Sequence, residues 1–239
     1  PEVISVDKTG KLKVHTTKTA SAVITASYGP VVQNVTVTVA DGRFWYSLGN
    51  GLGNGLDNNW YLDGNNASVV SSDGNKTTVQ MGSGYRGDLW LARSGKGKIV
   101  NVTPADYRYF AIKVGFKSQL VPGKNKPNGC IKLEIFDDGI KKIGPEYFGT
   151  GGDANNRYEI LGASEISTTE PNVLYYDLQS KYKTVTPTDW NQVFDLVQCK
   201  FVIADFPETA QTYDLYWIRS FKSIEELQAF VDSENNTNE

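Results

Sequence analysis

Short runs of alternating apolar and polar residues, separated by turn-forming residues, constrain the fold of this chain more than any other feature. In residues 107–116, Phe110, Ile112, Val114 and Phe116 share one parity, whereas Tyr109 and Lys113 lie on the other. Such period-two alternation is typical of a half-buried β-strand. Similar runs recur at 3–6, 11–14, 22–26, 35–39, 77–81, 88–93, 131–135, 173–178, 197–204 and 213–220. The sequence therefore predicts an all-β protein.

The turns and the missing crossover helices narrow this fold class. Asp-Gly pairs, which favour hairpin turns, begin at Asp41, Asp63, Asp73 and Asp138. Strands that follow one another without intervening helices favour packed antiparallel sheets over a parallel sheet. For residues 41–239 we expect a β-sandwich of jelly-roll type, because eight or more strands fall in this part of the chain.

One helix is predicted, at the C-terminal end. Ser223 and Glu226 have the spacing of a capping box, in which the serine side chain caps the first turn and the glutamate reaches back. Ile224, Leu227, Phe230 and Val231 then form an apolar stripe at helical spacing, which we expect to dock on the sandwich. Residues 233–239 are polar, and we expect them to fray.

Composition excludes several classes of function. The 239 residues carry a net charge of -3, which does not favour binding to a negatively charged phosphate backbone. Nucleic acid is therefore not an expected partner. The single histidine is His15, so catalysis by a histidine base and a multi-histidine metal site are both excluded for residues 41–239. No run approaches the ~20 apolar residues that cross a membrane. No compact pair of catalytic carboxylates is apparent, and we do not expect an enzyme.

Residues 1–40 contain only four short strands, fewer than the seven of a complete immunoglobulin-like sandwich. The runs at 4–12, 22–26 and 35–39 resemble the C-terminal half of a bacterial Ig-like group 2 domain. The resemblance implies a spacer module of a secreted or surface protein, and we expect a domain boundary after residue 40. Because the sequence begins at Pro1 without a signal peptide, we expect a processed or excised fragment. Residues 1–40 should then pair with strands upstream of Pro1, or form an incomplete sheet if nothing precedes them.

Cysteines and loops leave two structural questions open. Cys130 and Cys199 could be bridged or could be two buried thiols. The Gly/Asn-rich residues 49–60 match no phosphate-binding motif and are interpreted as a surface loop. Asp/Asn/Gly loops at 57–59, 63–66 and 151–156 have the composition of calcium ligands but also of ordinary turns. No cofactor is expected, and structural calcium is left open.

Aromatic residues carry the strongest functional signal. An exposed indole or phenol ring can cover the flat C–H patches of a sugar while its polar edge faces water. Trp60 ends the Gly/Asn-rich loop, Tyr85 and Arg86 follow a glycine-rich turn, and Trp90 alternates with Leu89 and Leu91. We therefore predict a sugar-binding platform of Trp60, Tyr85 and Trp90, with Arg86 as a hydrogen-bonding partner. Trp217 is expected in the core, whereas Trp45 and Trp190 remain undecided.

A second resemblance agrees with this interpretation. Residues 213–231 are similar to the end of a C-terminal domain family of surface glycan-binding proteins and some glycanases, encoded in polysaccharide-utilisation loci similar to the starch-utilisation system. The resemblance implies a cell-surface location, an outer-membrane lipoprotein anchor in the full-length protein, and an outer-membrane glycan transporter complex as partner. No binding residue is carried over from it.

The predicted function is non-catalytic binding of a polysaccharide, for which flat β-linked plant glycans such as glucans or xyloglucan are the best candidates. The alternative is a structural or adhesive surface module with a protein ligand. Glycoside hydrolysis ranks third.

Overall fold

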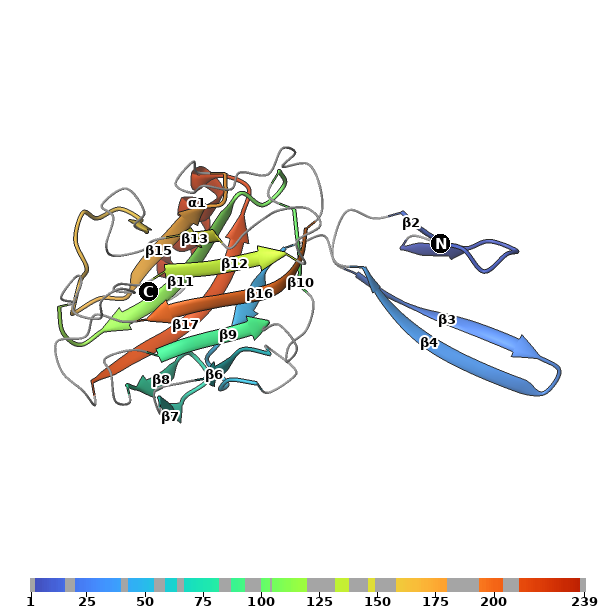
Figure 1. Cartoon of the computed structure of the whole chain (residues 1–239), viewed down its shortest axis with the longest axis horizontal. Coiled ribbons are helices and arrows are strands. Elements are labelled where there is room, and N and C mark those ends of the chain that lie inside the picture. The colour runs from blue at the N-terminus through green and yellow to red at the C-terminus, as the bar shows by residue number, and fades with distance from the viewer. Residues whose placement is uncertain are drawn as a thin grey trace.

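The computed structural model describes residues 3–15, 20–39, 43–53, 59–63, 67–81, 87–92, 100–103, 105–119, 132–137, 146–148, 158–179, 194–203 and 211–236. These residues form several antiparallel β-sheets and a C-terminal helix, so the all-β prediction is confirmed (Figure 1).

The first large sheet has six strands. Its order is β13 (Glu146–Phe148), β12 (Lys132–Asp137), β16 (Phe194–Ile203), β9 (Gly87–Ala92) and β6 (Tyr61–Asp63). A short strand, β10 (Val100–Val102), pairs with the first part of β16 beside this path. Strands far apart in the sequence thus become neighbours in the sheet, and all the pairings are antiparallel.

The second large sheet has seven strands. Its order is β14 (Glu159–Ile160), β15 (Asn172–Asp177), β11 (Tyr109–Phe116), β17 (Thr212–Phe221), β8 (Thr77–Gln80) and β7 (Ser68–Ser72). The remaining strand, β5 (Trp45–Ser47), also pairs with β17. The turn between β7 and β8 begins at Asp73, whose carboxylate accepts the backbone N–H groups of Asn75 and Lys76, as the Asp-Gly pair predicts.

The two large sheets pack face to face around a common core. Leu89 and Phe201 contribute from the six-stranded sheet, whereas Phe110, Ile112 and Ile218 contribute from the seven-stranded sheet. The predicted inward parity of residues 110–116 is therefore correct. Cys199 is a free thiol in this core, which agrees with the buried-thiol alternative for this residue, while Cys130 lies outside the described residues.

The helix, α1 (Ile224–Asn236), covers the outer face of the seven-stranded sheet. Ser223 caps it, because its Oγ accepts the N–H of Glu226 at 3.2 Å, and the Glu226 carboxylate accepts the N–H of Lys222 at 2.7 Å. Leu227 is fully buried against Ala111, Trp217 and Phe221, with Phe230 and Val231 packed beside it. The predicted helix and its docking are confirmed. It is neither long nor apolar enough to span a bilayer.

The prediction that Trp217 packs in a core is confirmed, and the cluster that holds it lies between the seven-stranded sheet and α1. One expectation about this region needs correction, because the helix extends to Asn236 and so includes part of the polar stretch for which fraying is predicted. The reason is tertiary, because the Glu234 carboxylate accepts hydrogen bonds from Lys113 and Trp217 on the sheet below.

The N-terminal segment forms two hairpins beside the sandwich (Figure 1). One joins β1 (Ile4–Val6) to β2 (Leu12–Val14) through a turn in which Asp7 accepts the N–H groups of Thr9 and Lys11. The other joins β3 (Ala20–Tyr28) to β4 (Val31–Val39). Within the described part of the chain, neither hairpin adds a strand to a large sheet.

Candidate functional site

Trp60 does not lie at the surface. Its side chain is fully buried in the core, with its ring 5.7 Å from that of Phe201 and 5.9 Å from that of Tyr46. The expectation of an exposed ring at this position is therefore wrong. The position precedes β6, so no alternating pattern in the sequence fixed the direction of the side chain.

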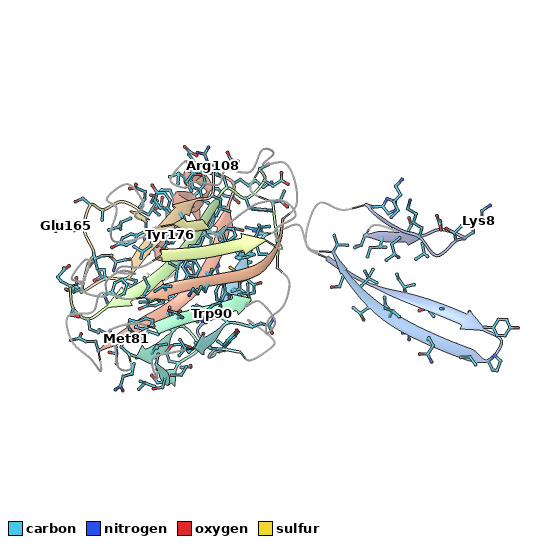
Figure 2. The ribbon with its side chains drawn as sticks, in the orientation of Figure 1. Lys8, Met81, Trp90, Arg108, Glu165 and Tyr176 are labelled. Carbon is cyan, nitrogen blue, oxygen red and sulfur yellow. The ribbon has the colours of Figure 1, made fainter. Side chains whose placement is uncertain are left out.

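Trp90 lies on β9 (Figure 2). Because Leu89 and Leu91 belong to the core between the sheets, the alternation of the strand turns Trp90 to the opposite face. The predicted parity is thus correct. The ring is only 7% exposed, however, and the Lys200 Nζ lies 4.4 Å from its centroid. Lys200 also forms a buried ion pair with Asp88 at 3.0 Å. Trp90 belongs to a buried polar cluster, not to an open surface.

The predicted platform is therefore not present as such. Trp60 and Trp90 lie on opposite sides of the six-stranded sheet and cannot offer one continuous ring surface. Tyr85 and Arg86 lie outside the described residues, as do Trp190 and most of the three loops with calcium-like composition. In the described part of the chain, no three acidic, histidine or cysteine side chains gather as metal ligands would.

The structure instead offers a groove beside α1, on the outer face of the seven-stranded sheet. Its volume is about 670 Å³. It is lined by the turn after β7, by β11, β15 and β17, by the loop before β15 and by the last turns of the helix: Asn75, Lys113, Glu170, Pro171, Val173, Tyr216, Val231, Glu234 and Asn235. Its volume falls in the usual range of ligand pockets.

An irregularity in the sheet places Tyr216 in this groove. Trp217 pairs with Lys113 and Leu215 pairs with Val114, so Tyr216 is the extra residue of a β-bulge. Leu215 points into the core, whereas Tyr216 is partly exposed on the outer face. A tyrosine phenol is protonated at neutral pH and can donate a hydrogen bond, and burial raises the pKa of Tyr216 further above its ordinary value.

Lys113 and Glu234 form the polar floor of the groove. The Lys113 Nζ lies 3.1 Å from the Glu234 carboxylate and 5.6 Å from the Tyr216 ring. The same carboxylate accepts the Trp217 indole N–H at 3.1 Å. Both charged side chains are mostly buried, which holds their polar atoms in place. The outward parity of Lys113 is predicted by the sequence, but the role of Glu234 is not.

Asp214, two residues before Tyr216 on β17, is the centre of a cluster of charged side chains beside the groove. This buried carboxylate accepts hydrogen bonds from Lys76 and Lys117, each at 2.8 Å, and from the Thr78 hydroxyl at 2.7 Å. Burial alone would raise the pKa of Asp214, but these hydrogen bonds outweigh it and hold the pKa below its usual value. The same hydrogen bond to Asp214 raises the pKa of Lys76. The ionised cluster ties β8 to β17 beside the groove.

Comparison with known proteins places the chain in a family. Residues 51–227 match a family described as a domain of unknown function, DUF4979. The chain belongs to this family. The match spans the sandwich from β6 to β17 and the first residues of α1, and so contains most of the groove. No curated protein matches the sequence.

A solved structure described as a low-affinity xylan-binding module, CBM86, from the xylanolytic gut symbiont Roseburia intestinalis is distantly similar to this DUF4979 protein. The two chains are 11% identical, and the match covers 87% of this chain and 98% of the other, with a TM-score of 0.28. A TM-score this low supports no conclusion about this chain.

Proposed function

We propose that the sandwich binds a polysaccharide at the bacterial cell surface, without cleaving it, through the groove beside α1. One observation carries the proposal. A partly exposed tyrosine ring lies in an open groove whose floor and walls supply fixed hydrogen-bond donors and acceptors. Sugars need both features, because their C–H patches stack on rings and their hydroxyl groups require polar partners.

The groove supplies these partners on several sides of the Tyr216 ring. The amides of Asn75 and Asn235 offer both donors and acceptors, Lys113 offers only donors, and Glu170 and Glu234 accept. Because Glu234 is already held by Lys113 and Trp217, little conformational entropy is lost there when a ligand binds. A shallow groove covers only part of a flexible chain, so we expect modest affinity.

The cell-surface location rests on the resemblance of the sequence to surface glycan-binding proteins. That resemblance also underlies the proposed outer-membrane anchor and the proposed glycan transporter partner. The exposed valines of β3 and β4 are consistent with a spacer completed by further strands.

The test compares two tyrosine variants by affinity electrophoresis against plant and host polysaccharides. Tyr216→Ala should weaken binding ten-fold or more, which corresponds to about 1.4 kcal/mol. Tyr28→Ala is the matched control, since Tyr28 is 90% exposed at the end of β3 and lines no part of the groove. Both variants should stay folded, because Tyr28 is exposed and Tyr216 is only partly buried at the edge of the cluster beneath α1.

Three outcomes would contradict the proposal. Equal binding by both variants would remove the groove as the site. Binding to none of the polysaccharides would favour the alternative of a module with a protein ligand. Release of reducing sugar from a bound polysaccharide would show an enzyme.

A further inference from the structure

A second cavity adjoins the groove, between α1 and the segment that joins β14 to β15. Its volume is about 430 Å³, and its walls come from the segment between β14 and β15 and from the middle of the helix. The two cavities share five lining residues: Glu170, Pro171, Val173, Val231 and Asn235. They are therefore two parts of one trough between α1 and the outer edge of the seven-stranded sheet.

Each part has its own lining. Tyr216 and Lys113 belong to the first cavity, whereas Leu161, Ala163 and Gln228 belong only to the second. Each cavity alone is in the size range that holds a drug-sized ligand. A ligand that fills both must therefore be longer than one that fills either.

The charges along the trough restrict the ligand further. Glu170, Glu234 and Asp232 line it, and Lys113 is the one cation among its described lining residues. Glu234 is already paired with Lys113 at 3.1 Å and with Arg219, which lines neither cavity, at 3.9 Å, so Glu170 and Asp232 carry the remaining negative charge. A uronic-acid chain would therefore meet excess negative charge, which costs binding energy, whereas hydroxyl groups can donate to the carboxylates.

From the shared walls and these charges, we infer that the trough takes an internal stretch of an uncharged polysaccharide that spans both cavities. The inference rests on the proposed function and adds the length and charge of the ligand. Val231 and Pro171 line both cavities, so the polysaccharide contacts apolar side chains where it passes from one cavity to the other.

The experiment measures affinity by calorimetry for neutral β-linked oligosaccharides of two to six sugar units. We expect affinity to rise with length until the trough is full. Reduction of the terminal sugar to an alditol should change the affinity of the longest oligosaccharide less than two-fold. A polyuronate of matched length should bind at least ten-fold more weakly.

Two helix variants locate the second cavity. Gln228 is exposed and lines only the second cavity, so Gln228→Trp should obstruct it and lower the affinity for the hexasaccharide to that for the trisaccharide. Ala229→Trp is the matched control, because Ala229 is also exposed on α1 but lines neither cavity. The disaccharide should bind all three proteins equally.

The outcomes separate the two proposals. If a polysaccharide binds but affinity does not rise beyond the disaccharide, or if the two tryptophan variants behave alike, the inference is overturned while the proposed function stands. If the polyuronate binds as well as the neutral chain, the charge argument is wrong. If no saccharide binds at all, the proposed function fails and this inference fails with it.

Discussion

Two tryptophans on opposite sides of one sheet show how a single residue's surroundings decide its role. Trp60 fills the core between the sheets, and Trp90 packs beneath Lys200 on the outer face. Both are buried, with 0% and 7% of their surface exposed. Replacement of either ring leaves a cavity that its neighbours cannot fill completely.

We therefore expect both Trp60→Ala and Trp90→Ala to destabilise the protein. A buried tryptophan replaced by alanine costs about 3–5 kcal/mol, which urea melts can measure. Trp90→Ala should also remove the cation–π contact of Lys200 but leave its ion pair with Asp88 intact. A melting curve unchanged by either substitution would show that the ring is exposed after all.

The same residues show what could be predicted from sequence. The face of Trp90 follows from the flanking leucines, and the outward position of Lys113 follows from the alternation of β11. Nothing local marks the partners of these side chains, because Lys200 and Asp88 meet only through the pairing of β16 with β9. The position of Tyr216 is partly predictable from the sequence. Its alternation with Leu215 turns the side chain outward, but the bulge that places it in the groove depends on the pairing of β17 with β11.

Helix α1 illustrates how an element combines local and tertiary signals. The cap at Ser223 and the apolar stripe are both predicted from the local sequence, and both are observed. The length of the helix cannot be predicted locally, because the polar residues after Val231 give no helical pattern. Glu234 extends the helix by binding Lys113 and Trp217, which lie 121 and 17 residues away in the chain.

Three substitutions should grade these contributions to the helix. Ser223→Ala removes one cap and should cost about 1 kcal/mol. Leu227→Ala leaves a cavity under the helix and should cost about 2–5 kcal/mol, since this side chain is fully buried. The exposed Gln228→Ala should stay within about 0.5 kcal/mol and is the control. Equal and negligible losses for all three in denaturant melts would mean that α1 does not dock on the sheet.

At the scale of the whole molecule, the described residues before residue 40 and those of the sandwich differ in packing. The sandwich has a continuous core that includes Phe44 and Leu48, just after the predicted boundary. The segment before it forms two-stranded hairpins, which are marginally stable by themselves. Val23, Val31 and Val35 are each more than half exposed there, so this segment buries little apolar surface.

A chain that begins at residue 43 should therefore fold as the full chain does. We expect its melting temperature to lie within about 2 °C of the full chain, because few stabilising contacts are removed. Arg43 is kept, since its guanidinium lies 3.8 Å from the Trp45 ring. Polysaccharide binding should be unchanged, because no lining residue of the trough precedes Asn75.

A chain that begins at residue 49 is the contrasting variant. It loses β5, the buried Phe44 and Leu48, and the backbone hydrogen bond from the Ser220 N–H to the Phe44 carbonyl at 2.8 Å. Two fully buried side chains cannot be removed from one core without a loss of several kcal/mol, so cooperative melting should be lost or shifted well below that of the chain from residue 43. If the chain from residue 43 is already destabilised to the same extent, the boundary near residue 40 is wrong and the N-terminal segment belongs to the folding unit of the sandwich.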